Sequence, residues 1–371
     1  MPTGQQFRRT GWFVRIFGHP DFQARIRHIP ILSHVAARNG QYLFEQVQGF
    51  VSAQVLFALV ALDIPRRLLD DSLVEEGCGE LDDIPAEKMQ LLLQAGAAIG
   101  ILKRHRDGRY SLTRQGAVTC GVPGLREMIL HHQAFYRDMT DPLSLLRNAT
   151  ATELSTIWPY VRDGGAGMDP AIVDSYSLLM AESQKLVAQD SLRLMDLNRV
   201  RCLMDVGGGN GAFLIAAGGA QPELDMMLFD LPEVTERARG RIESAGLSHR
   251  VAIHSGSFLR DPLPIGADAI SLIRVLYDHS DAHVATILKS CFAALPPGGV
   301  LLVSEPMSGG TRPDSITDVY FAFYTLAMRS GRTRTPQEIA SLAQAAGFRT
   351  IRTPASPRPY VTSVLTVRRP G

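Results

Sequence analysis

An apolar strand that ends in an acid and passes directly into glycines constrains this chain more than any other feature. Residues 202–211 read Cys-Leu-Met-Asp-Val-Gly-Gly-Gly-Asn-Gly. A strand that opens into a glycine turn lets backbone amides approach a nucleotide-like ligand closely. The sequence therefore predicts a nucleotide-type pocket at the edge of an α/β sheet.

The acid at Asp205 separates two ligands that such a turn could hold. The pattern Gly207-x-Gly209-x-x-Ala212 also satisfies the dinucleotide fingerprint, whose amides hold a pyrophosphate. A carboxylate just before the first glycine repels a pyrophosphate and suits a cation, and S-adenosylmethionine (SAM) carries a sulfonium and an ammonium group. Asp205 therefore favours SAM.

A second acid follows at the distance expected of a ribose ligand. An apolar strand over 226–229 ends at Asp230, about 20 residues after the glycines, where a ribose-binding carboxylate is expected. The alternative is a plain βαβ turn in which Asp230 caps a helix. Asp205 and Asp230 together favour the ligand site over that alternative.

Composition and charge limit the remaining classes. The 371 residues exceed the usual size of one domain, and 45% of them are hydrophobic, so we expect two domains with large cores. The formal net charge is +1 and the basic residues are scattered, which speaks against a nucleic-acid partner. The four cysteines show no metal-type spacing, so no metal is expected.

The sequence also bears on where the chain resides. No segment has the character of a signal peptide, which predicts a cytoplasmic protein with reduced thiols. The most apolar stretch, 50–62, has 13 residues and is short of the ~20 that span a bilayer. We expect it to form a buried helix.

The amino-terminal part predicts helices followed by a winged helix. Residues 1 to about 30 have no sustained period and are expected to form an arm. Over 41–69 the apolar residues recur at helical spacing and are dense enough to face both a core and a partner chain, which predicts a homodimer. A helix over 85–100 precedes two short strands around Asp107-Gly108, a hairpin signal. The helix residues 87–98 include one lysine, so DNA binding is not expected.

A helical connector and an alternating α/β half complete the pattern. The connector, 124–197, carries Tyr176, Met180 and Ser183 at helical spacing, where they could roof the pocket or pack in the core. Helices are expected over 233–245, 282–294 and 336–346, and strands over 251–254, 269–275, 300–304, 348–353 and 360–367. This alternation predicts a doubly wound α/β sheet.

Four motifs together are specific. They are Tyr-Ser-Leu-Thr at 110–113, Asp-Val-Gly-Gly-Gly-Asn-Gly at 205–211, Phe-Asp-Leu-Pro at 229–232 and Leu-Pro-Pro-Gly-Gly at 295–299. With them the chain resembles the two-domain SAM-dependent small-molecule O-methyltransferases, which include plant caffeate and bacterial polyketide enzymes. The resemblance covers most of the chain.

That resemblance implies a fold and a domain organisation. The fold is a class I methyltransferase Rossmann-like doubly wound sheet with an all-helical plus winged-helix amino-terminal dimerisation domain. The implied domains are a dimerisation domain over 1–123, a helical connector that contributes to the substrate pocket over 124–197, and a SAM-binding domain over 198–371.

Three further segments, 274–281, 304–310 and 320–328, look most like a narrower group of that family. It comprises the purple-bacterial enzymes that methylate the tertiary hydroxyl of acyclic carotenoids. This implies O-methylation of a 1-hydroxycarotenoid in carotenoid biosynthesis, with S-adenosylhomocysteine (SAH) as the second product. A lipophilic substrate further suggests peripheral contact of the amino-terminal helices with an inner or photosynthetic membrane.

Other functions remain open at this point. The substrate could be a phenolic or polyketide hydroxyl. The chain could also be a non-catalytic SAM-binding regulatory protein, or a winged-helix regulator that binds DNA, although the charge balance speaks against the latter.

The candidate site residues follow from the motifs and the resemblance. The cofactor candidates are Asp205, Gly207, Gly209, Gly211, Asp230, Leu231, Ser257, Phe258 and Arg274. The substrate-pocket candidates, which could equally pack in the core, are Tyr176, Met180, Ser183, Phe323, Tyr324 and Met328. The family usually has Gly-Asp-Phe where this chain has Gly-Ser-Phe at 256–258. A serine keeps a hydrogen bond without the charge.

The catalytic candidates are Tyr277, Asp278, His279 and Glu305. The family commonly places a His at position 277 as proton acceptor, flanked by two acids, of which one matches Glu305 and the other position holds Thr333. A tertiary alcohol is too weak an acid for a His to deprotonate beforehand, so proton removal should accompany or follow attack. Loss of the His therefore fits an aliphatic substrate.

The remaining histidines have less direct roles. His279 could be an acid–base group, because its ordinary pKa lies near neutrality, or it could be structural. His131 and His132 are adjacent in sequence, which is not ligand spacing on one helical face, and we interpret both as structural.

Overall fold

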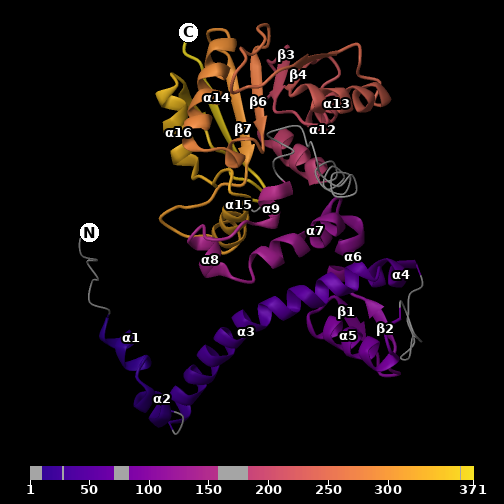
Figure 1. Cartoon of the computed structure of the whole chain (residues 1–371), viewed down its shortest axis with the longest axis vertical. Coiled ribbons are helices and arrows are strands. Elements are labelled where there is room, and N and C mark those ends of the chain that lie inside the picture. The colour runs from indigo at the N-terminus through magenta and orange to yellow at the C-terminus, as the bar shows by residue number, and fades with distance from the viewer. Residues whose placement is uncertain (1–10, 27–28, 71–82, 158–182, 360) are drawn as a thin grey trace. The chain divides into compact units, whose positions relative to one another are not determined.

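The computed structural model describes residues 11–26, 29–70, 83–157, 183–359 and 361–371. Contacts divide the chain into two compact units, Met1–Thr119 and Cys120–Gly371, whose elements are drawn in Figure 1. The domain limits at residues 123 and 197 stay a prediction.

The first unit contains helices and one hairpin. Its elements are α1 (Trp12–Phe17), α2 (Pro20–Ile26), α3 (Pro30–Ala61), α4 (Ile64–Asp70), α5 (Ala86–Ala98), β1 (Leu102–Arg104) and β2 (Tyr110–Leu112), and α6 (Arg114–Gly121) reaches its boundary. Prolines begin α2 and α3, where the first turn leaves the backbone N–H without a helical partner in any case. Leu59, Leu68, Leu93 and Tyr110 join α3, α4, α5 and the hairpin into one core.

The predicted hairpin is confirmed. Leu102 pairs with Leu112 and Arg104 with Tyr110 in antiparallel register. The turn between the strands contains Gly108 at φ 87°, a left-handed conformation that glycine adopts without steric cost.

One expectation for this unit is wrong, and two others gain detail. The expected arm contains the helices α1 and α2. The helical pattern over 41–69 is divided between α3 and α4, because Asp63 adopts a left-handed φ of 56° between them. The stretch 50–62 does not form a buried helix: Leu59 and Val60 are buried, but Phe50 is 60% exposed.

Helix α3 is also much longer than its most apolar stretch. Over Ile31–Ala61 it is, among the described residues, the helix that by length and composition could cross a membrane, a test that core helices and signal sequences also pass. The apolar stretch 50–62 is thus the last part of a longer helix to which residues 31–49 also belong. The exposed large apolar side chains of α3 are Ile31, Val35, Tyr42, Leu43, Phe44, Val47, Phe50 and Val51.

The second unit begins with helices, of which α7 provides a capping side chain for α9. They are α7 (Leu125–Asp138), α8 (Pro142–Leu146) and α9 (Glu153–Ile157), and a further helix covers 183–194. The Asp138 carboxylate at the end of α7 accepts hydrogen bonds from the amides of Glu153 and Leu154, at 2.6 and 2.9 Å. These bonds satisfy donors that the first turn of α9 leaves unpaired.

Seven strands form the sheet of this unit. They are β3 (Cys202–Val206), β4 (Asp225–Asp230), β5 (Val251–Ser255), β6 (Ala269–Ile273), β7 (Val300–Glu305), β8 (Arg349–Arg352) and β9 (Ser363–Arg368). Their order is β5-β4-β3-β6-β7-β9-β8. The pairs from β5 to β7 are parallel, and β9 is antiparallel to both of its neighbours, β7 and β8. The predicted doubly wound α/β sheet is confirmed.

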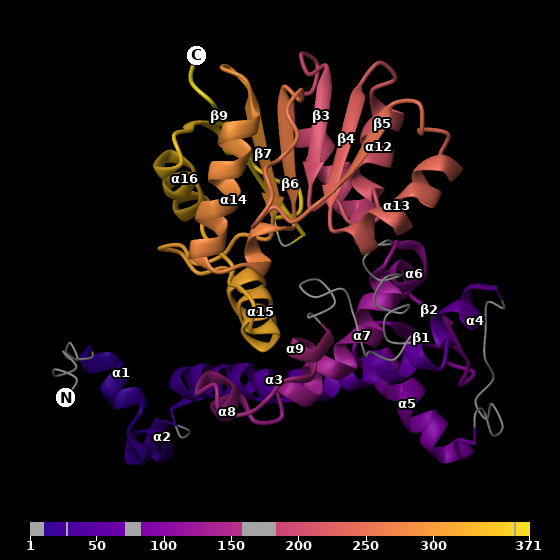
Figure 2. The same cartoon turned by 45° about the horizontal axis from the view of Figure 1, so that its top comes forward.

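Helices cover both faces of the sheet (Figure 2). They are α12 (Ala212–Ala220), α13 (Pro232–Ser244), α14 (Asp281–Ala294) and α16 (Pro336–Ala345). Successive strand residues point to opposite faces, so Leu203 packs with α12, α13 and the helix 183–194, whereas Met204 packs with α14 and α16. Two cores thus hold β3 rigidly between them.

A third core lies beside the sheet. The short turns η1 (Leu276–Asp278) and η2 (Thr317–Phe321) precede α14 and α15 (Ala322–Met328) respectively. Tyr324 and Met328 of α15 pack with Phe135 of α7, Leu145 of α8 and Leu154 of α9.

Candidate functional site

The carboxyl ends of the parallel strands bring the candidate acids to one edge of the sheet (Figure 2). In register, Val206 pairs with Phe229 and Ile273 with Ser304, so the segments that follow β3, β4, β6 and β7 leave the sheet side by side. Open α/β sheets bind their ligands at this edge.

The glycine turn closes over β3 and leads into α12. Gly207 adopts φ 71° and Gly211 adopts φ 79°, conformations that other residues rarely take. A β-carbon on Gly207 would come 2.8 Å from the Val275 side chain, so the turn also needs glycine for space. The Gly207 amide donates to the Phe229 carbonyl at 2.8 Å, which ties the turn to β4.

Asp205 lies beneath this turn with half of its carboxyl unsatisfied. Its Oδ1 accepts a hydrogen bond of 2.6 Å from the Ser271 hydroxyl, whereas its buried Oδ2 has no hydrogen-bond partner in the described part of the chain. Burial, with a smaller contribution from the charge of Asp230, raises the pKa of Asp205 to about 7, although the hydrogen bond from Ser271 lowers it. Because an unpaired buried acceptor is costly, the site fits a ligand that brings a donor or a positive charge.

Asp230 joins the two turns. Its Oδ2 accepts from the Gly209 amide at 2.8 Å, and its Oδ1 accepts from the Leu231 amide at 2.7 Å. Burial raises the pKa of Asp230 to about 6, although the two backbone bonds lower it. Helix α13 has Leu231 at its N-cap and no side-chain capping bond. The interpretation of Asp230 as a helix cap is therefore wrong.

The two candidates after β5 are half-buried. The Ser257 amide donates to Asp261 Oδ2 at 2.7 Å, and the Phe258 ring meets the ring of His279 edge-on, with centroids 5.3 Å apart. His279 also lies 6.0 Å from His283 between ring centroids. The structure thus places His279 against Phe258.

Arg274 follows β6 in a strained conformation. Its φ is 58°, a left-handed value that a bulky residue adopts only when its surroundings hold it. The Arg274 amide donates to the Ser304 carbonyl at 2.7 Å, and the guanidinium bonds Tyr277 Oη at 3.2 Å and Ser183 Oγ at 3.5 Å. In this conformation the guanidinium reaches the candidate catalytic residue Tyr277.

Tyr277 and Asp278 lie in the turn η1. Burial raises the pKa of the Tyr277 phenol above its ordinary value of 10.0, although the Arg274 charge opposes the shift. Burial also raises the pKa of Asp278 well above its ordinary value, and its Oδ1 has no partner among the described residues. The Tyr277 phenol is therefore neutral over the physiological range, so it does not act as a phenolate base.

Glu305 ends β7 and holds that turn in place. Its Oε2 accepts from the amides of Leu276 and Tyr277, at 3.0 and 3.2 Å. The side chain is fully buried, and burial raises its pKa to about 7. Capping of a turn by Glu305 is thus present in the structure. At the position of the second family acid, Thr333 accepts a hydrogen bond from the Ser308 hydroxyl.

The substrate-pocket candidates are only partly brought together. Tyr176 and Met180 lie outside the described residues. Ser183 reaches Arg274, and Phe323, Tyr324 and Met328 belong to the core of α7, α8, α9 and α15. Phe323 is half-buried, whereas Tyr324 and Met328 are buried.

Sequence reasoning missed Arg334, which is fully buried. Its guanidinium donates to the carbonyls of Leu276 and His279, at 2.9 and 2.7 Å, and forms an ion pair with Asp281 at 2.7 Å. It therefore supports both ends of the segment that carries Tyr277 and Asp278. A lone arginine between two threonines gives no signal in the sequence. Its partners Leu276 and His279, 58 and 55 positions upstream, belong to the segment 274–281, which the sequence does indicate as a candidate site.

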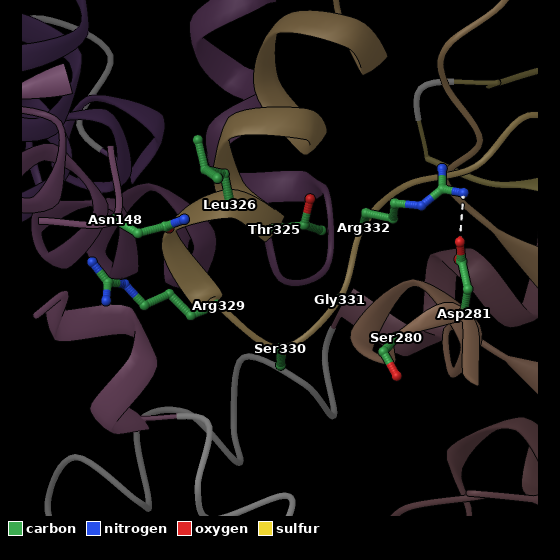
Figure 3. Close-up of a pocket in the computed structure, with 9 residues that line it drawn as sticks. All are labelled: Asn148, Ser280, Asp281, Thr325, Leu326, Arg329, Ser330, Gly331 and Arg332. Carbon is green, nitrogen blue, oxygen red and sulfur yellow. Dashed lines mark hydrogen bonds and ion pairs between the residues drawn. The ribbon is translucent and has the colours of Figure 1, made fainter. Parts of the chain in front are cut away.

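A separate cavity of about 390 Å³ lies beside the loop after α15 (Figure 3). It is lined by Asn148, Ser280, Asp281, Thr325, Leu326, Arg329, Ser330, Gly331 and Arg332. None of the candidate site residues lines it. Figure 3 shows Arg332 bonded to Asp281 across its wall, at 3.1 Å.

Comparison with known proteins decides the family. Residues 137–349 match the model of the O-methyltransferase domain. The chain is 49% identical to a demethylspheroidene O-methyltransferase of Cereibacter sphaeroides, over 96% of this chain and 94% of the relative. The chain belongs to the O-methyltransferase family.

Further relatives agree with this membership. A demethylspheroidene O-methyltransferase of Rhodobacter capsulatus is 42% identical over 97% of the chain and 90% of the relative. The solved structure of a methyltransferase in calicheamicin biosynthesis, in its SAH-bound form, is 26% identical and matches with a TM-score of 0.77 over 90% of this chain and 99% of that one. The predicted fold class and the resemblance to O-methyltransferases are confirmed.

The O-methyltransferase domain encloses the cofactor and catalytic candidates. Its match begins at residue 137 and ends at 349, so it contains Asp205, Asp230, Arg274, Tyr277 and Glu305. Helices α1 to α6 lie outside it.

Proposed function

We propose that this O-methyltransferase transfers the methyl group of SAM to the tertiary 1-hydroxyl of an acyclic carotenoid in carotenoid biosynthesis. The observation that carries the proposal is the 49% identity, over 96% of the chain, to a demethylspheroidene O-methyltransferase. A second relative with the same name, at 42% identity, supports it. Bound SAM supplies an electrophilic methyl group, and SAH is the product that leaves.

The glycine turn and the two acids would hold SAM. The unpaired Oδ2 of Asp205 suits the ammonium group of the donor, and the amides of the turn suit its carboxylate. Asp230 would accept from the ribose hydroxyls, as expected of an acid at the end of the second strand. Ser257 and Phe258 would contact the adenine. Leu231, next to Asp230, and Arg274 would also contact the cofactor.

Tyr277 and Arg274 would position the acceptor hydroxyl. Burial keeps the Tyr277 phenol neutral, so it orients the alcohol by hydrogen bonding and does not remove its proton. Burial also raises the pKa of Asp278 and that of Glu305, the latter to about 7, which reduces their negative charge relative to exposed acids. A weakly acidic alcohol needs positioning and dehydration more than a strong base, and this arrangement provides both.

Apolar side chains would surround the rest of the substrate. Phe323, Tyr324 and Met328 of α15 would provide this apolar wall, with Ser183 at Arg274. Tyr176 and Met180 are expected to add further contacts. A charge that disperses during transfer is favoured by such surroundings over water. His279, packed on Phe258, would support the adenine side of the site.

The exposed apolar residues of α3 support two further parts of the proposal. Exposed large apolar side chains, among them Tyr42, Phe44, Val47 and Phe50, recur along α3. Contiguous exposed apolar surface is typical of sites that bind a partner or a membrane. We propose that this face of α3 packs against a second copy of the chain in a homodimer. We also propose that part of the amino-terminal surface contacts the inner or photosynthetic membrane from the cytoplasm. Sedimentation of the Val47→Glu variant tests the dimer, and flotation with liposomes tests the membrane contact.

Incubation with methyl-labelled SAM tests the reaction. A 1-hydroxy acyclic carotenoid, flat phenols and polyketide phenols are offered in parallel, and mass analysis identifies the molecule that gains the methyl group. We expect transfer to the carotenoid alcohol. Transfer to phenols alone, or binding of SAM without transfer to any acceptor, would contradict the proposal.

A further inference from the structure

His131 and Tyr324 form a hydrogen-bonded pair between α7 and α15. His131 Nε2 lies 2.8 Å from Tyr324 Oη, although the two residues are 193 positions apart. The pair joins α7 to α15, and the ring centroids are 6.1 Å apart at an angle of 58°. The sequence alone indicates a structural role for His131 and places Tyr324 either in the substrate pocket or in the core.

Tyr324 lies on the helix whose following loop contacts the candidate catalytic turn. Its ring stacks on Tyr320, with centroids 5.6 Å apart and planes 30° from parallel. After α15, a β-carbon on Gly331 would come 2.2 Å from the Tyr277 carbonyl oxygen, so this loop lies directly against η1. Tyr324 is also one of the residues proposed to surround the substrate.

Both members of the pair are neutral in the resting protein. Burial lowers the pKa of His131 to about 4, the neighbouring His132 lowers it further, and Glu153 on α9 partly opposes them. Burial raises the pKa of Tyr324 well above its ordinary value. A neutral imidazole has one ring nitrogen that accepts, so Nε2 can receive the hydrogen bond that the Tyr324 hydroxyl donates.

Resting on the proposed function, we propose that Tyr324 takes the proton of the methylated hydroxyl while it passes its own proton to His131. The substrate oxygen donates a lone pair to the methyl carbon, the carbon–sulfur bond breaks with its electron pair on sulfur, and SAH is neutral at sulfur. The proton on the new ether oxygen moves to Tyr324 Oη, and the phenolic proton moves to His131 Nε2. His131 ends as imidazolium, which loses its proton to solvent before the next turnover.

A weakly basic histidine suffices for this role. A base that removes a proton before attack must match a very weak acid, but the oxygen of a protonated ether is a strong acid. The pair therefore needs to accept a proton only as the new carbon–oxygen bond forms. Because both members are neutral before methyl transfer, they place no charge near the sulfonium of the donor. This answers how a chain with tyrosine at position 277 removes the proton.

His132 provides a contrast on the same helix. Its Nδ1 bonds the Met128 carbonyl one turn earlier, and its ring stacks on Tyr320 with centroids 5.3 Å apart. Its hydrogen bond stays within α7. The proposal therefore concerns His131, and the interpretation of His132 as structural is unchanged.

The test separates hydrogen bonding from proton acceptance. In His131→Gln the amide oxygen still accepts a hydrogen bond from Tyr324, but it does not take up a proton near neutral pH. We expect kcat to fall about 100-fold with KM changed less than about threefold, and the solvent isotope effect on kcat to rise. Tyr324→Phe should lower kcat by a similar factor, and the double variant should be no slower than the slower single one.

Exposed His249, which lies on the second unit away from α7, provides the matched control. His249→Gln should retain the kcat of the original protein, and thermal unfolding should show that the His131 and Tyr324 variants are folded. If His131→Gln keeps kcat and the solvent isotope effect of the original protein, its role is structural and the proposal is wrong.

A readout without turnover keeps this test independent of the proposed substrate. In ¹⁵N spectra, His131 should titrate below pH 5 with Nε2 accepting a hydrogen bond, and Tyr324→Phe should shift that nitrogen. An unshifted nitrogen would overturn the proposal whatever the substrate. If the original protein methylates another alcohol and no carotenoid, the proposed substrate fails, and the His131 variants are compared on that alcohol.

Discussion

Gly331 lies against the main chain of Tyr277. A β-carbon on Gly331 would come 2.2 Å from the Tyr277 carbonyl oxygen and 2.4 Å from the His279 amide nitrogen. Both contacts are with backbone, which has little freedom to move because Glu305 and Arg334 bind the same turn. The loop after α15 therefore sets the position of the candidate catalytic segment from behind.

We expect Gly331→Ala to displace that segment. The substitution should destabilise the protein by about 1–3 kcal/mol, in the range of overpacked sites, and lower kcat more than it weakens SAM binding. Thermal unfolding, kinetics and calorimetry measure the three effects. Gly240→Ala is the control: it adds a β-carbon in open space on α13 and should be neutral or slightly stabilising. Equal effects of the two substitutions on kcat would contradict the expectation.

Arg334→Met should be among the most destabilising changes in the second unit. It removes the donors of the Leu276 and His279 carbonyls in a fully buried place, and each unpaired group costs about 1–3 kcal/mol. We expect a loss of more than about 2 kcal/mol, measured by denaturant unfolding. The control is Arg332→Met, because Arg332 is 47% exposed and its ion pairs should contribute little. If Arg334→Met lowers the free energy of unfolding no more than Arg332→Met does, the turn η1 is stable without Arg334 and the expectation is wrong.

The Asp205 carboxyl should make SAM binding depend on pH. Its pKa is about 7 and that of Asp230 about 6, and only the ionised forms attract the cationic donor. Affinity should therefore rise as the pH increases from 5.5 to 8, and calorimetry of Asp205→Asn should show weaker binding with a smaller rise. An unchanged pH dependence in the variant would contradict this assignment.

The same substitution should stabilise the ligand-free protein at high pH. The folded pKa of Asp205 lies above its ordinary value of 3.8, so the acid's contribution to stability is present below that value and is lost as the pH rises through about 7. Asp205→Asn removes this loss, and we expect a gain on the order of 1 kcal/mol at pH 8 and none at pH 4. Thermal unfolding at the two pH values provides the comparison, and a loss of stability at pH 8 would refute it.

Tyr277 should contribute position and not ionisation. Tyr277→Phe removes the hydroxyl that bonds Arg274, and we expect kcat to fall about 10-fold. Because the pKa of Tyr277 is raised above its ordinary value of 10.0, the pH profiles of variant and original protein should have the same shape between pH 7 and 9. A limb that disappears in the variant would identify Tyr277 as a titrating group. In Tyr277→His, a gain of activity on phenols would indicate that this position selects the acceptor.

The sheet could be predicted from the sequence because its signals are local. The apolar runs of β3, β4, β6 and β7 are continuous, as buried parallel strands require, and the glycines mark where a chain turns at the edge. The two acids of the cofactor site lie at the carboxyl ends of two adjacent parallel strands, β3 and β4. The sequence could therefore predict that Asp205 and Asp230 lie close together.

What depends on distant packing could not be predicted. The supports of the 276–279 segment, Gly331 and Arg334, come from a loop about fifty residues later, and no pattern in the sequence connects them. His131 and Tyr324 are brought together by the core of α7 and α15. The length of α3 was missed because polar residues such as Arg38, Asn39 and Gln41 interrupt the apolar pattern without ending the helix.

The place of β9 has a consequence for how the second unit is made. Since β9 lies between β7 and β8, the sheet is complete only when residues up to Arg368 have been synthesised and have left the ribosome. A nascent chain that ends earlier leaves the edge of β7 open to pairing with other chains, which favours aggregation. The sheet of the second unit is therefore completed last at β9, and truncation of the chain before β9 should yield insoluble protein.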